Sequence, residues 1–294
     1  MAPVDSTAAM LLTGPVPGGL AMADYLRLAA VLNGRLGIKL PAEKRGMLEM
    51  RLRPRLRQLG HAGFGSYCRY LFEAGGLAAE MQHLIDAVTT NKTDFFREPE
   101  HFALLRERIV PDLLERRAGE ASPLLKLWSA AASTGAEAYS IAMVLEEMRR
   151  TGADFRYSVL GTDISSQVLE RASEAVYAAQ MALPVPAALK QRYLMASIYG
   201  GQGAVVRVIP ELRQRTRFLQ LNLMDRSYRV DRDVDVIFLR NVLIYFAPDD
   251  QDAVVRRMLS HLRPGGVLIL GHAEAAIGSR LGLDETGPGV FRPG

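Results

Sequence analysis

The chain has 294 residues, of which 49% are apolar and 23% charged, and its formal net charge is +4. This composition is typical of a globular protein with a sizeable core, and it excludes a low-complexity chain. Cys68 is the only cysteine, which excludes a disulfide framework and a cysteine-based metal cluster and fits a reducing, cytosolic setting.

The first segment in chain order, residues 1–21, is predicted to be a disordered leader. It has no basic stretch before its apolar part, and Pro15, Pro17, Gly18 and Gly19 interrupt that part, unlike in a signal peptide. No apolar run in the chain approaches the roughly 20 residues that span a bilayer. We therefore expect no direct membrane insertion.

Residues 22–88 are predicted to form a small all-helical domain, because apolar residues recur there at three and four positions. Pro54 is expected to bend or break the central helix. The apolar stripe of that helix consists of Met47, Leu48, Leu52, Leu56 and Leu59.

Positive charge is concentrated in residues 41–60, where six basic and two acidic residues leave a surplus equal to that of the whole chain. Two interpretations stay open: a solvated face of the helical domain, or a docking surface for an acidic partner. The candidate docking residues are Arg51, Arg53, Arg55 and Arg57.

The stretch "TTNKTDFFREPEHF", residues 89–102, sets two adjacent phenylalanines among hydrogen-bonding side chains. One interpretation is an active-site linker in which Phe95 and Phe96 exclude water while Thr93 and Arg97 face a ligand. The other is the start of a helix, with the aromatic pair as a hydrophobic plug and Thr93 as the cap.

From residue 124 onward, short apolar strands alternate with amphipathic helices, which predicts a doubly wound, mostly parallel α/β sheet. The expected strands are 124–131, 157–164, 233–243 and 265–274, and the expected helices are 135–150, 165–177 and 248–262. A small antiparallel β insertion is expected between about residues 193 and 217, from "GAVVRVI" and "TRFLQLNL". The α/β domain as a whole is predicted to span residues 89–294.

Ligands bind beyond the carboxyl ends of the strands in such sheets. The first loop, "SAAASTGAE", has small side chains but lacks the GxGxxG pattern, which disfavours a pyrophosphate cradle and a nicotinamide oxidoreductase. Asp163 follows the second strand, where an acid accepts hydrogen bonds from ribose hydroxyls. Its alternative role is a helix cap, although Ser165 and Ser166 can serve as that cap equally well.

"LRPGG" followed by a strong apolar strand occurs at residues 262–270, an arrangement that recurs in S-adenosylmethionine-dependent methyltransferases. More specifically, "NKTDFFRE", "WSAAASTGAEAYSIAM", "LGTDIS" and "LRNVLIYF" occur in this order. Together with "EKRGMLEMRLRPRLRQLG" and "GHAE", they resemble the CheR family of chemotaxis receptor methyltransferases over roughly residues 22–275. The resemblance implies a class I methyltransferase that moves a methyl group from S-adenosylmethionine to glutamate side chains of membrane chemoreceptors (methyl-accepting chemotaxis proteins). The products would be glutamyl methyl esters, for adaptation in chemotaxis signalling, and S-adenosylhomocysteine.

The same resemblance implies a set of cofactor-binding residues. Glu137 would hold the methionine amino group, Asp163 the ribose, and Asn222 with Leu223 the adenine side. The chain departs from the family's usual "STGEEPYS" at Ala136 and Ala138. The full set is Asn91, Thr93, Arg97, Glu137, Asp163, Asn222, Leu223, Arg240 and Asn241.

Arg97 and Tyr245 are the expected catalytic residues. A glutamate carboxylate has an ordinary pKa near 4.3 and is already anionic at neutral pH, so no general base is needed. We expect these two side chains to orient the carboxylate. The partners implied are the cytoplasmic, glutamate-rich region of receptors and, in some family members, a receptor C-terminal tail at the β insertion.

Two other functions are open to a chain of this composition. A nucleic-acid methyltransferase is disfavoured because "RNVLIYF" lacks the Asn/Asp-Pro-Pro-aromatic motif and no aromatic residues interleave with the arginines. A non-catalytic, cofactor-binding adaptor would be favoured by loss of Thr93, Arg97 or Tyr245, all of which are present. No metal site is expected, because the five histidines show no ligand spacing; only His272 is considered as a pocket residue.

Overall fold

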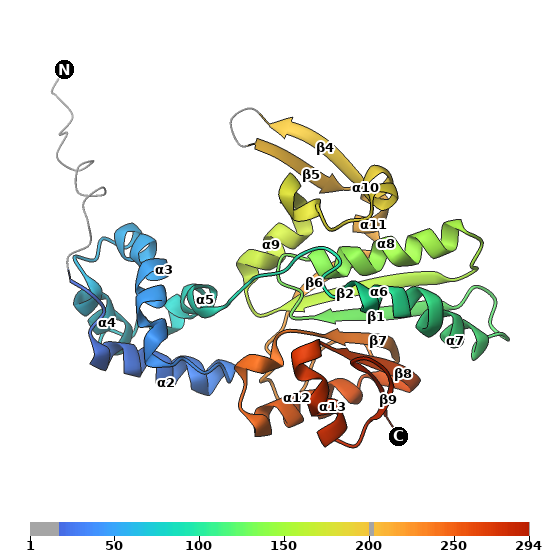
Figure 1. Cartoon of the computed structure of the whole chain (residues 1–294). Helices are drawn as coiled ribbons and strands as arrows, with labels where there is room; N and C mark the ends of the chain where they lie inside the picture. Colours follow the sequence, from blue (N-terminus) through green and yellow to red (C-terminus); the bar gives the residue numbers. More distant parts are fainter. Residues whose placement is uncertain (1–17, 200–202, 294) are drawn as a thin grey trace. The chain divides into compact units, whose positions relative to one another are not determined.

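The computed structural model describes residues 18–199 and 203–293. The chain divides into two compact units, Met1–Thr90 and Asn91–Gly294 (Figure 1), whereas the sequence predicts a boundary after residue 88. Residues 1–17 of the expected leader lie outside the described residues. At the end of that segment, Leu20 is buried and its backbone N–H donates to a carboxylate oxygen of Glu49 at 3.2 Å, so the predicted disorder does not extend to this residue.

The first unit is all-helical, as its apolar spacing predicts. Leucines four positions apart, Leu48, Leu52 and Leu56, share one buried stripe. The predicted stripe was too wide, because Leu59 is 37% exposed. The helices are α2 (Met22–Leu36), the short 3-10 helix η1 (Ala42–Lys44), α3 (Arg45–Gln58), α4 (Phe64–Phe72) and α5 (Leu77–Val88).

Pro54 does not break α3, which runs through it to Gln58. A proline lacks the N–H that would bond to the carbonyl of Met50, one turn earlier. Both Pro54 and Met50 are exposed, so water can satisfy that carbonyl.

The second unit carries a seven-stranded sheet in the order β6-β2-β1-β7-β8-β10-β9. The first five of these strands are parallel, and β10 and β9 are antiparallel. The strands are β1 (Leu124–Ala130), β2 (Arg156–Asp163), β6 (Thr216–Gln220), β7 (Val234–Leu239), β8 (Leu262–Leu270), β9 (Asp284–Gly287) and β10 (Val290–Arg292). The mostly parallel α/β sheet predicted from the sequence is confirmed.

Helices and turns connect these strands, and helices lie on the sheet (Figure 1). A continuous helical stretch made of α6, the π-helical segment η2 and α7 precedes β1. This stretch comprises α6 (Pro99–Leu104), η2 (Leu105–Ile109) and α7 (Val110–Glu115). The other connecting elements are α8 (Ala136–Arg150), α9 (Ser166–Glu174), α11 (Pro210–Gln214), η4 (Leu243–Tyr245), α12 (Pro248–Leu259), η5 (His272–Glu274) and α13 (Ala275–Arg280).

A separate three-stranded antiparallel sheet has the order β3-β5-β4 and forms the β insertion. Its predicted limits were wrong at both ends. The insertion includes β3, which lies before residue 193, and it ends at β5, because "TRFLQ" is strand β6 of the parallel sheet and pairs with β2. The insertion comprises β3 (Val176–Ala178), η3 (Ala179–Ala182), α10 (Ala187–Tyr193), β4 (Leu194–Tyr199) and β5 (Gly203–Val208).

The order of the parallel strands places a switch point beside β1. The chain proceeds from β1 to β2 and β6 on one side and returns to β7 and β8 on the other. Connections from β1 and β7 therefore diverge, and a crevice at their carboxyl ends is the usual ligand site of such sheets.

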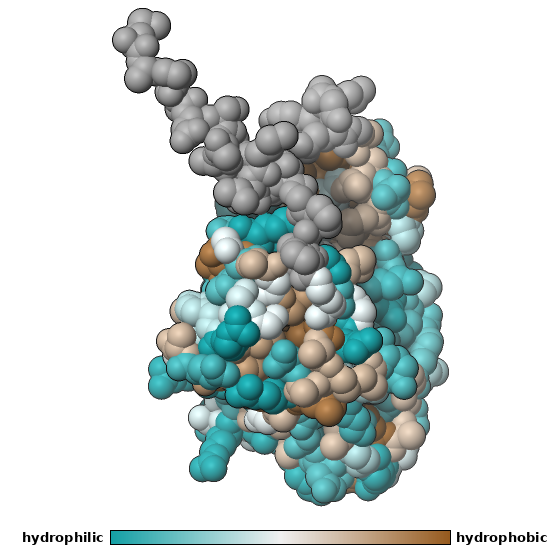
Figure 2. All heavy atoms as spheres, turned by 90° about the vertical axis from the view of Figure 1, so that its left-hand side faces the viewer, coloured by the Kyte–Doolittle hydropathy of each residue, from teal (hydrophilic) through white to brown (hydrophobic). Residues whose placement is uncertain are grey.

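Hydrophilic and apolar side chains are interspersed on the face seen in Figure 2. Exposed large apolar residues of the helical unit include Met50 and Leu26. None of the helices in the described part of the chain is both long enough and apolar enough to cross a membrane.

Candidate functional site

Backbone strain gathers at the carboxyl ends of β1 and β7. Ala131 and Ser133, after β1, have φ angles of 58° and 51°, and Asn241, after β7, has a φ of 58°. Residues with a side chain rarely adopt this left-handed region, and such residues concentrate at functional sites where neighbouring contacts hold them in place. The strand ends named by the sequence analysis are therefore held in special conformations.

Asp163 holds the loop after β1. One carboxylate oxygen accepts a hydrogen bond from the backbone N–H of Ser133 at 2.9 Å, and the other accepts one from Ser165 at 3.0 Å. The hydroxyl of Ser165, and not Asp163, caps α9. The carboxylate of Asp163 thus lies at the end of β2 beside the loop after β1, the place where ribose hydroxyls are predicted to bind.

Gly135 ends the same loop with a φ of 84°. A Cβ atom at this position would lie 2.9 Å from both Ala172 and the ring of Phe218. The loop therefore requires glycine for two reasons, its backbone conformation and its close approach to α9 and β6.

Arg240 is the centre of a buried charge cluster. Its guanidinium lies 2.8 Å from Glu137 and 3.0 Å from Glu98, and its side chain is only 1% exposed. The other oxygen of Glu137 accepts a hydrogen bond from Ser129 at 2.7 Å. The linker, the first turn of α8 and the end of β7, which are distant in sequence, thus meet through one arginine.

Glu98 was not among the predicted site residues. Its other oxygen accepts a hydrogen bond from the side chain of Asn241 at 3.1 Å. Burial raises the pKa of Glu98, but the hydrogen bond from Asn241 and the charge of Arg240 outweigh it, so the pKa lies below its ordinary value. Glu98 is ionised at neutral pH and ties the linker to the end of β7.

Phe95 and Phe96 anchor the linker to the core of the α/β unit. Phe95 is fully buried with its ring edge-on to Tyr177, and Phe96 packs against Phe102 at 5.1 Å between ring centroids. The backbone N–H of Phe96 donates to the hydroxyl of Ser140 at 3.0 Å. The hydrophobic-plug interpretation is therefore confirmed for the aromatic pair.

The predicted cap is wrong, because the helix begins at Pro99 with Glu98 at its N-cap position, well beyond Thr93. Thr93 itself is half-buried. The carbonyl of Asn91 accepts a hydrogen bond from the Ser133 hydroxyl at 3.0 Å, which joins the linker to the β1 loop. Arg97 reaches the carbonyl of Lys92 at 3.3 Å, within its own segment.

Glu274 is a second residue that the sequence analysis missed. It is 1% exposed and accepts hydrogen bonds from successive backbone N–H groups of Asn241, Val242 and Leu243 at 2.6, 2.8 and 2.7 Å. Burial raises its pKa, and the backbone donors oppose that rise. The loop that ends in half-buried Tyr245 is built around this carboxylate.

Asn222 and Leu223, the predicted adenine contacts, follow β6. The side chain of Asn222 accepts a hydrogen bond from the backbone of Met224 at 2.9 Å, which closes a turn. The carbonyl of buried Leu223 accepts hydrogen bonds from Tyr228 at 2.7 Å and Arg257 at 3.0 Å. This turn lies at the same sheet edge as Asp163, whose backbone carbonyl accepts a hydrogen bond from the N–H of Leu221, directly before the turn, at 2.9 Å.

The arginines predicted to dock a partner have contacts inside the helical unit. Arg55 pairs with buried Glu80 at 2.7 and 2.9 Å, which gives it a structural role within the unit, and its docking role stays a prediction. Arg51 donates to the carbonyls at residues 87 and 89 at the end of α5, and Arg53 pairs with Glu49. Arg57 is exposed.

Two histidines that show no ligand spacing in the sequence lie side by side in the fold. His101 and His272 lie with their ring centroids 5.2 Å apart, and Glu98 and Glu100 complete a cluster with them. Burial, helped by the charge of Arg240, lowers the pKa of His101 to about 4.

Comparison with known proteins places both units. A family model described as "CheR methyltransferase, SAM binding domain" matches residues 91–282, and one described as "CheR methyltransferase, all-alpha domain" matches residues 23–89.

Curated relatives match over most of both chains. A "Chemotaxis protein methyltransferase" of Escherichia coli is 40% identical over 87% of this chain and 85% of its own length. "Chemotaxis protein methyltransferase 2" of Pseudomonas aeruginosa is 36% identical over 92% of each chain. A "Chemotaxis protein methyltransferase" of Borreliella burgdorferi is 34% identical over 92% of this chain and 93% of its own length.

Proposed function

This chain belongs to the CheR methyltransferase family, and on that premise we propose that it methylates glutamate side-chain carboxylates of membrane chemoreceptors. It is an S-adenosylmethionine-dependent methyltransferase. The finer assignment, a glutamate O-methyltransferase whose products serve adaptation in chemotaxis, is the proposal. We place its action in the cytoplasm, where the signalling region of a chemoreceptor lies.

The carboxylates that lie at the carboxyl edge of the sheet are the main support for this proposal. Glu98 and Glu137 share the buried cation Arg240, and Asp163 adds a third carboxylate at the end of β2, so among these side chains negative charge is in excess. S-adenosylmethionine carries a sulfonium and an ammonium against one carboxylate, so its net charge is positive. A negative site with a loop of small residues fits this cation and would repel a pyrophosphate.

Within this proposal, different side chains bind different parts of the cofactor. Asp163 holds the ribose hydroxyls, and Glu137 holds the methionine amino group with its unused acceptor positions. Asn222 and Leu223 lie on the adenine side. Asn91, Thr93 and Arg97 of the linker close over the cofactor, and Arg240 and Asn241 support it from the end of β7.

S-adenosylmethionine supplies an electrophilic methyl group. A carboxylate oxygen of the receptor glutamate forms a bond to the methyl carbon while the carbon–sulfur bond breaks, and the electron pair stays on sulfur. The product is a methyl ester, and no proton is transferred, because the carboxylate is anionic at neutral pH. The protein therefore contributes alignment and exclusion of water.

We assign the orientation of the substrate carboxylate to Arg97 and Tyr245. Arg97 belongs to the linker, which Phe95 and Phe96 fix to the core. Tyr245 belongs to the loop that Glu274 holds. Because Arg97 and Tyr245 lie on two segments that are each held in place, their guanidinium and hydroxyl groups can fix the orientation of the substrate carboxylate toward the methyl group.

The helical unit is proposed to dock the acidic, helical region of the receptor. Arg57 is exposed on α3, and Arg51 and Arg53 extend the basic face although they also have partners within the unit. A receptor C-terminal tail is proposed to dock at the β insertion, where β4 is an edge strand that can accept a further strand.

Transfer of labelled methyl groups from S-adenosylmethionine to receptor-containing membranes tests the proposal. Label that is released by mild base, and that is absent when the receptor is absent, supports ester formation. Cofactor binding without label on any receptor would replace the proposal by the adaptor function. Base-stable label on added nucleic acid would overturn the substrate class.

A further inference from the structure

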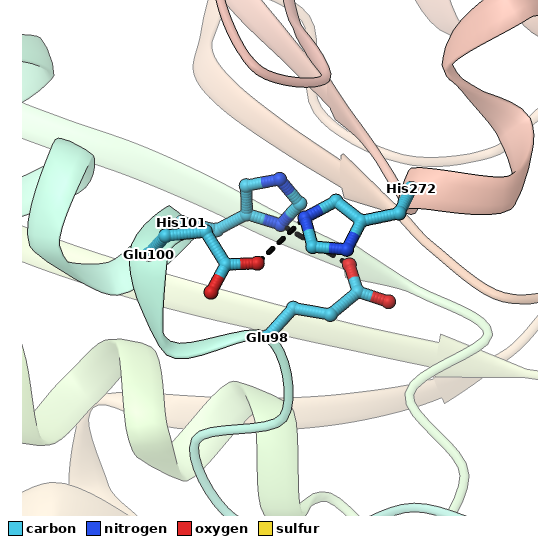
Figure 3. Close-up of side chains that lie close together, drawn as sticks. All are labelled: Glu98, Glu100, His101 and His272. Carbon is cyan, nitrogen blue, oxygen red and sulfur yellow. Dashed lines mark ion pairs between the residues drawn. The ribbon is translucent and has the colours of Figure 1, made fainter.

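Four side chains with metal-binding chemistry converge beside the linker (Figure 3). One ligand atom from each of Glu98, Glu100, His101 and His272 lies within 4.8 Å of the others. The first three come from the linker and the first turn of α6, and His272 begins η5. The cluster is formed only by the fold, since its last member is far away in the sequence.

His101 is the informative member. Its side chain is fully buried, and its Nε2 lies 3.1 Å from the carbonyl oxygen of Pro288. Nε2 must donate to that carbonyl, so the lone pair of the neutral ring resides on Nδ1. This tautomer is the one that a backbone carbonyl imposes on metal-binding histidines.

The Nδ1 atom of His101 is buried and has no hydrogen-bond partner. It faces the cluster, with the nearest oxygen of Glu98 at 3.5 Å. A buried acceptor that receives no hydrogen bond is costly and rare in folded proteins. A ligand atom supplied from outside the chain would satisfy it.

Charge favours a cation as that ligand. Glu98 and Glu100 bring two carboxylates, and the neighbouring cation Arg240 is shared between Glu98 and Glu137. Each carboxylate oxygen has a second acceptor position, so Glu98 can keep Arg240 and still bind a metal.

The donor set selects the kind of metal. Two imidazoles with two carboxylates suit zinc, whereas magnesium and calcium prefer oxygen donors alone. Tetrahedral zinc bonds of about 2.0–2.2 Å place neighbouring ligand atoms roughly 3.3 Å apart. His272 Nε2 and Glu100 Oε1 lie 2.6 Å apart, so small side-chain shifts suffice. Half-exposed His272 and Glu100 leave the cluster open to solvent for entry.

We propose that Glu98, Glu100, His101 and His272 bind one zinc ion. The ion ties the first turn of α6 to η5, the turn whose last residue, Glu274, holds the loop after β7. The site shares Glu98 with the charge cluster around Arg240, but its test measures metal binding and does not use activity.

The test uses the full chain without an affinity tag, stripped of metal by a chelator. Zinc is titrated against a chromophoric competitor, and Co²⁺ is added separately as a spectroscopic probe. We expect one equivalent of zinc with micromolar or tighter affinity, and the intense visible absorption of tetrahedral Co²⁺. His272→Ala and Glu100→Gln, both at half-exposed positions, should each weaken zinc binding at least tenfold.

His83→Ala removes an exposed histidine from α5 in the other unit and is the matched control. It should bind zinc as the wild type does. Thermal unfolding of the metal-free variants shows that they are folded. Zinc binding that survives in both cluster variants, an equal loss in the control, or no binding by the wild type would each overturn the proposal.

Discussion

The carboxylate of Glu274 lies 2.6 Å from the backbone nitrogen of Asn241, a residue 33 positions earlier. Asn241 has a left-handed backbone at the end of β7, and the same carboxylate also receives the N–H groups of Val242 and Leu243. One buried acid thus sets the conformation of the loop that carries Tyr245. The close approach also excludes a side chain at Gly271, where a Cβ would lie 2.7 Å from Glu274.

Glu274→Gln is expected to loosen that loop, because an amide offers one acceptor oxygen in place of two. We predict a loss of about 1–3 kcal/mol in the free energy of unfolding and a fall in kcat with little change in cofactor affinity. Urea unfolding and cofactor titration measure the two effects. Glu211→Gln, at an exposed position, is the control, and an equal effect there would refute the role of Glu274.

Arg240→Met should leave Glu98 and Glu137, whose side chains are 14% exposed, as uncompensated charges. Removing one partner of a buried ion pair costs about 3–5 kcal/mol, measured as the change in the free energy of unfolding. Adding Glu137→Gln to this variant should restore part of the lost stability, because it removes one of the two stranded charges. Arg226→Met, at an exposed position, should change stability by less than about 0.5 kcal/mol. Additive effects of the two cluster substitutions would contradict the account.

Gly135→Ala tests the loop after β1. The added methyl group would contact Ala172 and Phe218, and the alanine would have to adopt the left-handed backbone of Gly135. We expect a loss of about 2–4 kcal/mol in stability and weaker cofactor binding. Gly152→Ala shares the left-handed backbone but has open space around its Cβ, so it should cost only about 1–2 kcal/mol. Equal losses in both variants would show that packing at Gly135 is unimportant.

The helical unit should lose stability in acid through Glu80. The hydrogen bond from Arg55 lowers the pKa of Glu80, burial opposes this shift, and Tyr67 adds a second hydrogen bond that lowers it. Stability from such a carboxylate is fully present above its unfolded pKa of about 4.3 and is lost as the pH falls through the lower folded value.

Glu80→Gln should therefore be less stable than the wild type at pH 7, by roughly 1–3 kcal/mol. The difference between the two proteins should shrink below pH 4, where the wild-type carboxylate also becomes protonated. Denaturant unfolding of both proteins across this range measures it. A difference that does not change with pH would show that the ionised pair contributes nothing.

Arg97→Ala is predicted to bind S-adenosylmethionine more weakly, because Arg97 closes over the cofactor. At saturating cofactor it should still lose about 100-fold or more in turnover, because the substrate carboxylate is no longer aligned. Calorimetry and initial rates separate the two quantities. Full turnover together with normal binding would remove Arg97 from the mechanism.

Local sequence patterns predicted much of this architecture. Alternating apolar strands and amphipathic helices identified β1, β2, β7 and β8, because buried parallel strands and half-buried helices require those periods. Asp163 was found because an acid directly after a strand must lie at the carboxyl edge of the sheet. Each of these inferences depends only on the sequence of the segment in which the residue lies.

Contacts between segments that are distant in the sequence could not be predicted, because they leave no periodic pattern in either segment. The pairing of Arg55 with Glu80, the support of the β7 loop by Glu274, and the meeting of His101 with His272 depend on how the elements pack. Strand β6 was misplaced in the β insertion for the same reason, since a short apolar run does not reveal its neighbour. The site's framework could be predicted, but the charges that brace it could not.

The central claim is that a glutamate carboxylate receives the methyl group, and mass spectrometry of the methylated receptor tests it most directly. Peptides from receptor incubated with the enzyme and S-adenosylmethionine should carry single methyl groups on glutamate residues, and mild base should remove them. The same peptides from a reaction with Arg97→Ala should be unmodified. Methylation on lysine, on arginine or on the backbone, resistant to base, would contradict the account.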